Sequence, residues 1–432
     1  QIWQELGALQ GRQIVNHEEF ARIEGPNGKA FIVYTNLDRL EAHMKALAPG
    51  DSAVIEEMIA ATRRLSRMGA APDKPRELYN LGDALKALTM LPQLGELRKW
   101  AAMPVADFAK RFTDPFLREA FALLFGLPDF PMLGMLFTLA GLHMGDSGYP
   151  VGGSLPFAQA IERRYLDLGG QVYYRSRVAK ILVENDRAVG VQLADGSEHR
   201  ADLVISAADG HATLFDMLDG KYLTDEIRGY YERLPIFSPL VYVSLGVARD
   251  LSAEPHSISW PLDEPLMVGN VAHTRMPLKH YGYDPTMAPA GKSALVVMLP
   301  TDYDSWKQLG QDRAAYEAQK QRIAQDVIAI LDRRFPGLRE QVEVVDVATP
   351  LTTERYTGNW RGSFEGWLLT TETMQMTFGK GMSKTLPGLS NFYMIGQWVE
   401  PGGGLPPAAS SGRNAIQLLC HYDKKPFVTS LP

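Results

Sequence analysis

The sequence predicts an α/β fold divided into two domains, and three observations lead to this prediction. The chain has 432 residues, which is more than one hydrophobic core usually holds. The pattern up to residue 145 is mainly helical, whereas residues 149–215 alternate between strand and helix patterns. They end in the continuous apolar run Leu203–Ile205, as expected of a strand covered on both faces. Residues 389–420 show the pattern of a strand, a glycine-rich turn and a helix.

Composition and charge exclude several classes of protein. Hydrophobic residues make up 45% of the chain and charged residues 22%, as in a folded globular protein. The net charge is −6 and no basic stripe appears, so we expect no nucleic-acid partner. Cys420 is the single cysteine, and the nine histidines lack the spacing of zinc ligands, so we expect no disulfide and no metal. This cysteine usage fits the cytoplasm.

The N-terminal third predicts one hairpin followed by helices. Pro26-Asn27-Gly28 separates two short runs within residues 20–34, and Asn-Gly favours a hairpin turn. Residues 38–48 and 51–68 have helical patterns, and Asp51 is placed to cap the second helix. Helical pattern then dominates residues 77–145, with breaks expected at the prolines 92, 104, 115, 128 and 131.

The middle of the chain predicts most of the strands. A helix after Gly152-Gly153 should bury a face that includes Leu155, Ile161 and Leu166, and residues 172–174 should start a strand. Two further strands, at 178–183 and 189–193, should be joined at Asn185-Asp186. Residues 236–300 are rich in strand pattern, and 312–335 predict one long helix.

The C-terminal segment carries the strongest indication of a ligand. A buried strand over 392–395 runs into Gly396, and Gly402, Gly403 and Gly404 would let the backbone approach a ligand closely. The helix that follows would direct its N-terminal N–H groups towards this turn, where they favour anions. An ordinary glycine-rich turn is the alternative.

Many segments resemble, in order, a family of FAD-dependent oxidoreductases that includes bacterial phytoene desaturases, carotenoid isomerases and retinol saturases. They include MPVADFAKRFTDPFLREAF, YPVGGSLPFAQAI, RVAKILVENDRAVGVQLADGSEHRADLVISAAD, DPTMAPAGKSALVVML, TPLTTERYTGNWRGSFEGW and FYMIGQWVEPGGGLPPAASSG. The resemblance implies a Rossmann-like FAD domain, from residues 149–215 and 380–420. It also implies a substrate domain with a mixed sheet and helices, from residues 15–145 and 225–370.

The family opens with a strand, a G-x-G-x-x-G turn and a helix, and this chain has no such motif. Three explanations are open. The sequence is part of a longer protein, which we favour. Alternatively, the missing unit is a separate chain, or the protein has lost FAD.

The resemblance implies FAD as the cofactor and names the backbone that would contact it. The expected contacts are Gly152, Gly153, Val178, Ala207, Ala208, Asp209, Gly396, Gly402, Gly403, Gly404 and Leu405. Val178 would act through its backbone, which is compatible with a place in a core strand. Asp209 could instead cap the helix that begins near His211.

The family also implies an apolar polyene or isoprenoid substrate, which is desaturated, saturated or isomerised. Because the cofactor carries the difficult step, no catalytic side chain is identified. Tyr356, Trp360, Trp398 and Glu400 are candidates for the substrate face, with ordinary packing as the alternative for each.

Residues 130–145 are uncharged but shorter than a membrane span, so they should line a tunnel or lie peripherally on a membrane, with core packing as the alternative. The candidate lining residues are Met132, Met135, Phe137, Leu139 and Met144. A flavin amine oxidase and an FAD-less scaffold are the alternative functions. The sequence predicts no oligomeric state.

Overall fold

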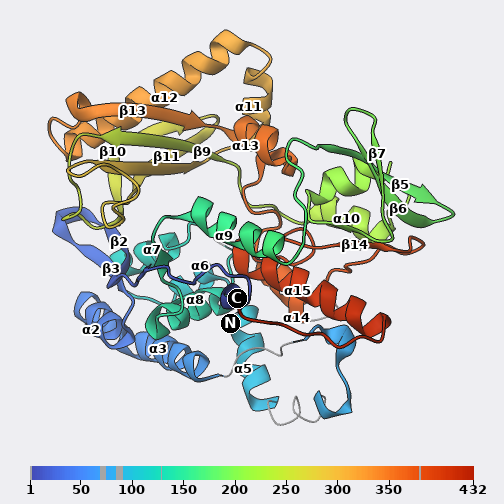
Figure 1. The fold of residues 1–432 in the computed structure, drawn as a ribbon. Coiled ribbons are helices and arrows are strands. Elements are labelled where there is room, and N and C mark those ends of the chain that lie inside the picture. The colour runs from blue at the N-terminus through green and yellow to red at the C-terminus, as the bar shows by residue number, and fades with distance from the viewer. Residues whose placement is uncertain (1, 69–73, 84–90, 128, 379–380) are drawn as a thin grey trace.

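The computed structural model describes residues 2–68, 74–83, 91–127, 129–378 and 381–432. Its largest sheet has seven strands in the order β13-β9-β12-β11-β10-β2-β3 (Figure 1). Only the β10–β2 pair among the paired neighbours is parallel. The strands are β2 (Glu19–Glu24), β3 (Ala30–Tyr34), β9 (Leu240–Val247), β10 (Ser257–Val268), β11 (Val271–His280), β12 (Ser293–Pro300) and β13 (Val342–Ala348).

One helix covers a face of this sheet. The prediction over 312–335 is confirmed as α12 (Arg313–Arg334), which Asp312 caps. Ile323, Val327 and Leu331 of α12 are buried in one apolar cluster with strand residues such as Val243 and Leu245. The shorter elements beside it are α11 (Tyr303–Leu309), η5 (Arg339–Gln341), α13 (Pro350–Thr357) and η6 (Trp360–Gly362).

The predicted hairpin is also confirmed. Strands β2 and β3 pair antiparallel around η1 (Pro26–Gly28), where Asn27 and Gly28 have φ values of 57° and 73°. The hairpin joins the sheet to the helical layer, because β3 contacts the first helix of that layer.

The helical layer lies below the sheet in Figure 1. It contains α2 (Leu37–Leu47), η2 (Pro49–Asp51), α3 (Ser52–Arg67), η3 (Arg76–Leu78), α5 (Leu91–Ala101), α6 (Val105–Ala109), α7 (Pro115–Leu123) and α8 (Met132–Met144). Pro92 lies in the first turn of α5, and Pro104, Pro115 and Pro131 lie at the starts of α6, α7 and α8. The predicted breaks at Pro104, Pro115 and Pro131 are confirmed. The break at Pro92 stays a prediction because residues 84–90 lie outside the described residues, as does Pro128.

The role predicted for Asp51 is wrong. Its side chain does not cap α3. It is buried and accepts hydrogen bonds from the Thr113 backbone and hydroxyl and from the Asp114 backbone N–H. The carboxylate therefore ties the start of α7 to the α2–α3 connection, because three donors from one turn satisfy it better than a single helix N–H.

Helix α8 packs mainly in the core. Met132, Met135 and Leu139 are buried with the helical layer, whereas Phe137 and Met144 are about half exposed. These positions favour core packing over the tunnel lining for the first three residues. No described helix has the length and apolar character of a membrane span.

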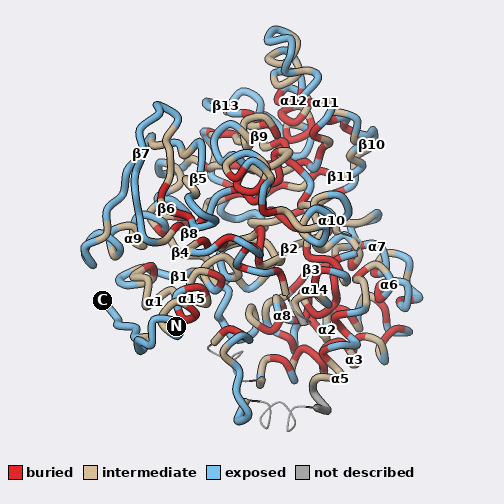
Figure 2. The backbone as a smooth tube through the Cα atoms, turned by 90° about the vertical axis from the view of Figure 1, so that its right-hand side faces the viewer, coloured by how far each residue is buried: buried red, intermediate tan, exposed pale blue. Residues whose placement is uncertain are grey.

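The third part of the fold combines segments far apart in sequence. Its parallel pair is β8 (Val204–Ser206) with β14 (Phe392–Met394), beside the antiparallel sheet of β5 (Val178–Glu184), β6 (Arg187–Leu193) and β7 (Glu198–Arg200). The other elements are α1 (Ile2–Glu5), β1 (Ile14–Val15), β4 (Tyr149–Pro150), α9 (Ser154–Asp167), η4 (Ala212–Met217), α10 (Asp225–Arg233), α14 (Thr371–Phe378) and α15 (Leu405–Tyr422). Figure 2 shows buried residues gathered in the helical layer and the large sheet.

Two predictions for the 150–175 region are wrong. Helix α9 buries only Phe157, and the face expected to be apolar and buried carries Leu155 at 67% exposure. Residues 172–174 form no strand and are exposed. Helical periodicity locates an apolar face but does not supply the neighbour that would cover it, and no described element covers this face.

The buried apolar residues form three clusters. One follows the helical layer, one follows the large sheet with α12, and one joins residues between Ile181 and Val399. The third cluster unites both stretches that were assigned to the FAD domain, although residue 380 lies outside the described part. The division into two domains stays a prediction.

Candidate functional site

The site begins where two parallel strands end side by side. Ala207 follows β8 and Gly396 follows β14, so both lie at the carboxyl edge of this pair. A Cβ placed on Gly396 would lie 4.0 Å from the Ala207 carbonyl oxygen, and no other described atom is closer. Gly396 has a φ of 95°, and its N–H donates to Ser411 Oγ of α15 at 2.6 Å. In open α/β sheets this edge is where ligands bind.

The glycine turn after β14 leads directly into α15. Gly402, Gly403 and Gly404 have φ values of 146°, 71° and 76°. Gly404 is the N-cap residue and supplies no side chain, and Pro406 and Pro407 have no N–H, so Leu405 supplies the one N–H of the first three positions in this 18-residue helix, without a side-chain partner. Such a helix start favours negative charge or electron-rich atoms.

A second glycine start lies at α9. Gly152 and Gly153 have φ values of 98° and 72°, and Gly153 is an N-cap without a side chain. Short helix α1 connects the two helices. Its Trp3 ring packs on the Phe157 ring of α9, with 5.3 Å between the ring centroids. Glu5 of α1 forms an ion pair with Arg413 of α15.

Asp284, which the sequence analysis missed, fixes the first of these turns. One of its oxygens accepts from the Gly152 N–H at 2.8 Å and from the Tyr149 hydroxyl at 3.0 Å. The other accepts from the N–H and hydroxyl of Thr286. Burial alone would raise the pKa of Asp284, but these hydrogen bonds outweigh it and lower the pKa. The Asp-Pro-Thr string was the available signal, because Asp and Thr two positions apart form local turns.

Asp209 is a helix cap, as the alternative interpretation proposed. Its two oxygens accept from the N–H groups of Ala212 and Trp360, both at 2.8 Å. Burial raises the pKa of Asp209 to about 6 despite these hydrogen bonds. The carboxyl therefore ties the segment after β8 to the aromatic loop at 360. Contact between Asp209 and the dinucleotide stays a prediction.

Two of the four substrate-face candidates come together. Trp360 and Trp398 lie with ring centroids 6.4 Å apart, and Tyr231 stacks on Trp398 at 6.1 Å. The Trp367 indole N–H donates to the Trp398 carbonyl, whereas the Trp398 indole N–H is buried without a partner among the described residues.

The other candidates are placed differently. Glu400 forms an ion pair with Lys384 at 2.8 Å. Tyr356 is 73% exposed at the end of α13, with Arg355 as its hydrogen-bond donor. Val178 begins β5, where it pairs with Leu193. The sequence analysis did not single out Glu365, whose carboxylate lies beside the glycine turn.

The residues present fit a flavin dinucleotide. At Gly396, Gly402 and Gly404 a Cβ would meet no described atom closer than 3.5 Å, so described atoms approach these glycines no closer than ordinary van der Waals contact. With the uncapped start of α15, these glycines make a cradle in which a ligand can approach the backbone closely. The buried Trp398 indole N–H, which has no partner among the described residues, would be a donor for a ligand with acceptor atoms. Leu405, at the start of α15, is exposed beside it.

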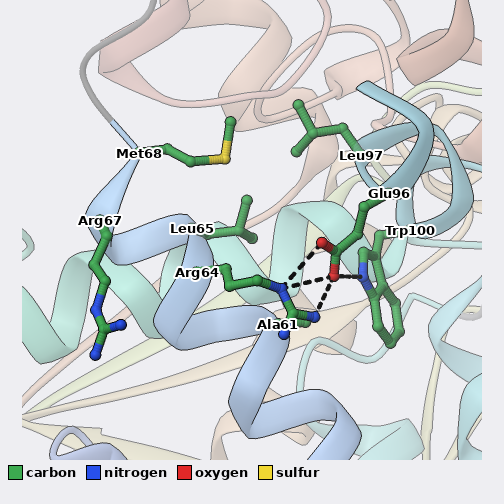
Figure 3. A pocket seen from close by; sticks show the side chains of 8 residues that line it. All are labelled: Ala61, Arg64, Leu65, Arg67, Met68, Glu96, Leu97 and Trp100. Carbon is green, nitrogen blue, oxygen red and sulfur yellow. Dashed lines mark hydrogen bonds and ion pairs between the residues drawn. The ribbon is translucent and has the colours of Figure 1, made fainter. Parts of the chain in front are cut away.

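A separate pocket of about 260 Å³ lies in the helical layer (Figure 3). Its walls come from the C-terminal part of α3 and from α5, and it holds the ion pair between Arg64 and Glu96. Its lining residues are Ala61, Arg64, Leu65, Arg67, Met68, Glu96, Leu97 and Trp100. None of them is a predicted site residue. Within the described ranges no group of His, Cys, Asp or Glu side chains could hold a metal ion.

Fold and site together define an α/β protein with a cradle for a dinucleotide cofactor at the carboxyl edge of parallel strands. A family model described as flavin containing amine oxidoreductase matches residues 2–420. The chain belongs to this family. The prediction of an FAD-dependent oxidoreductase is therefore confirmed at the level of the family.

Relatives and solved structures agree with this assignment. A chloroplastic prolycopene isomerase of Daucus carota is 28% identical over 286 residues, covering 65% of this chain but 45% of that protein. The chain thus spans about half the length of such relatives. A lycopene-forming phytoene desaturase of a Paracoccus species is 25% identical over 437 residues, covering 96% of this chain and 84% of that protein.

The likeness to solved structures shows the fold. A triple mutant of putrescine oxidase superposes with a TM-score of 0.58 at 13% identity, covering 98% of this chain and 84% of that one. An oxidoreductase from Methanosarcina mazei gives a TM-score of 0.52 at 16% identity, covering 94% and 82%.

Proposed function

We propose that this protein is an FAD-dependent oxidoreductase that acts on carbon–carbon double bonds of an apolar polyene or isoprenoid. The supporting observation is the set of side chains around the glycine turns. Phe237 lies beside Gly403 and packs on Phe364, and Tyr149 lies beside Gly153. Tyr281 and Tyr283 pack against Tyr149 at 6.2 and 5.0 Å. Aromatic walls with few charges suit an apolar substrate.

The chain's own residues would hold and orient the cofactor. Gly396, Gly402 and Gly404 would allow close backbone approach, and the first turn of α15 would offer the Leu405 N–H. Gly152-Gly153 would allow a second approach. Asp284 keeps the Gly152 turn in place, and the aromatic rings would exclude water. Bound FAD would supply two-electron redox chemistry, which side chains cannot supply.

Relatives support the substrate class. Proteins named prolycopene isomerase and phytoene desaturase are similar to this chain over long stretches. We propose that the reaction is a desaturation, a saturation or an isomerisation. We also propose a cytoplasmic location with peripheral membrane contact.

A spectrum and a substrate panel test the proposal. Purified full-length protein that carries the family's G-x-G-x-x-G unit should show bound flavin absorbance with added FAD, and such a protein that stays colourless would support the FAD-less scaffold instead. Phytoene and prolycopene in phosphatidylcholine vesicles should give products with altered double bonds by chromatography. Turnover of putrescine or another amine, without change in either polyene, would overturn the substrate class in favour of an amine oxidase.

A further inference from the structure

Glu365 lies beside the glycine turn. A Cβ placed on Gly403 would lie 2.3 Å from Glu365 Oε2, and one on Gly404 would lie 3.9 Å from Oε1. Both carboxylate oxygens therefore face the glycine turn that borders the proposed cofactor cradle. No predicted site residue brings an ionisable group so close to these glycines.

The loop that carries Glu365 is held from both ends. The buried Ser363 hydroxyl accepts from the Gly366 N–H and donates to the Gly366 carbonyl, both at 3.1 Å. The same carbonyl accepts from the Phe237 N–H at 2.9 Å, which anchors the loop to the start of the large sheet. The carboxylate is therefore presented by a preorganised turn, as a reacting group requires.

The surroundings of Glu365 contain few charges. Within the described residues it has no ion pair and no hydrogen bond, unlike Glu400, which pairs with Lys384. Burial raises the pKa of Glu365. Tyr242 of β9 is the titratable group electrostatically linked to it, and burial first and the Glu365 charge second raise the pKa of Tyr242. The remaining neighbours, Phe237 and the glycines, are uncharged.

We propose that Glu365 is the catalytic group that exchanges a proton with the substrate carbon. The inference rests on the proposed function. In the desaturating direction two neighbouring C–H bonds break. One hydrogen leaves with its electron pair to oxidised FAD, and the other leaves as a proton to the Glu365 carboxylate. The electrons of the second bond become the new π bond. In the saturating direction the protonated carboxyl would return the proton to one carbon, and the hydride for the other carbon would come from reduced FAD, which becomes oxidised. A carboxylate that is harder to ionise than usual is a stronger base.

A substitution that keeps shape but removes the charge tests this role. Glu365→Gln should keep the FAD content and the melting temperature, and should lower kcat for phytoene by about 10²-fold or more with KM little changed. Glu343→Gln is the matched control, because Glu343 is an exposed residue paired with Lys292 on the large sheet. This control should behave as the wild type.

Two readouts separate catalysis from a structural role. Infrared difference spectra between about pH 8 and about pH 5 should show a protonated carboxyl band that the Glu365→Gln protein lacks. The wild-type kcat for desaturation should fall as the pH drops through the raised pKa, and the variant should lose this limb. A Glu365→Asp protein should recover part of the rate.

The outcomes distinguish this inference from the proposed function. If the wild type converts phytoene and the Glu365→Gln protein retains more than about a third of kcat, the role of Glu365 is overturned while the function stands. An infrared band that titrates at an ordinary glutamate pKa would also overturn it. If the wild type converts no polyene, the proposed function fails and the proton-transfer step fails with it.

Discussion

Gly403 and Gly404 are adjacent, yet the structure predicts different consequences for an alanine at each. A Cβ at Gly403 would lie 2.3 Å from Glu365 Oε2 and 2.9 Å from the Phe237 ring. At Gly404 the nearest atom would be Pro406 Cδ at 3.7 Å. The requirement for glycine at 403 therefore comes from the protein itself. At position 404 the requirement for glycine comes from the backbone conformation and from the cofactor proposed to bind beside it.

The magnitudes follow from these contacts. A positive φ costs a residue other than glycine about 1–2 kcal/mol, and the conformation of Gly404, with φ 76° and ψ −175°, about 1–3 kcal/mol. Overpacking adds about 1–3 kcal/mol at Gly403, because Glu365 can swing aside but Phe237 packs on Phe364. We expect Gly403→Ala to lose about 2–5 kcal/mol of unfolding free energy.

The control is Gly337→Ala. Gly337 has a φ of 83° with no described atom within 4 Å of its Cβ position, so this variant should lose only the conformational term. Urea unfolding of the three apoproteins gives the stabilities, and FAD titration gives the affinities. Gly404→Ala should weaken FAD binding by about tenfold or more, since a clash worth about 1.4 kcal/mol changes Kd tenfold.

Either of two results would refute this reasoning. A Gly403→Ala protein as stable as Gly337→Ala would show that the Glu365 and Phe237 contacts do not constrain the turn. A Gly404→Ala protein that binds FAD like the wild type would remove the space beside Gly404 from the cofactor cradle.

Four further substitutions test the site. Asp284→Asn should lower the unfolding free energy by about 1.5–3 kcal/mol at neutral pH. Because folding lowers the pKa of Asp284, this difference is complete above its unfolded pKa and should shrink as the pH falls below about 4 in urea titrations. Trp398→Phe should weaken FAD binding, because it removes the buried indole N–H that lacks a protein partner. Trp367→Phe should lose about 1 kcal/mol of unfolding free energy with its hydrogen bond to the Trp398 carbonyl and keep its FAD affinity, so equal FAD affinities in the two variants would contradict a role of the Trp398 N–H in the cradle. Folding raises the pKa of Asp209, so the unfolding free energy of the wild type should fall as the pH rises from about 4 to about 6. An Asp209→Asn protein whose unfolding free energy falls equally over this pH range would show that Asp209 is not the group responsible.

The sequence by itself determined the features that depend on a few neighbouring residues. Asn27-Gly28 forms a hairpin because both residues tolerate positive φ, and Pro104, Pro115 and Pro131 begin helices because a proline N–H is not needed there. Helix α12 follows from its cap at Asp312 and its length. The family followed from the order of many such segments.

Only the tertiary structure decided which side chains meet. Asp284 accepts from Gly152, 132 positions away, and Asp51 accepts from Thr113 across 62 positions. The exposed face of α9 and the place of Glu365 beside Gly403 likewise depend on segments that are distant in the chain. Backbone preferences and periodicity act over one or two turns, so they fix elements and faces. The partner of a buried carboxylate is fixed by the packing of whole elements, because packing decides which N–H and hydroxyl groups lie next to it. A buried donor without a partner is costly, so these groups pair with the carboxylate.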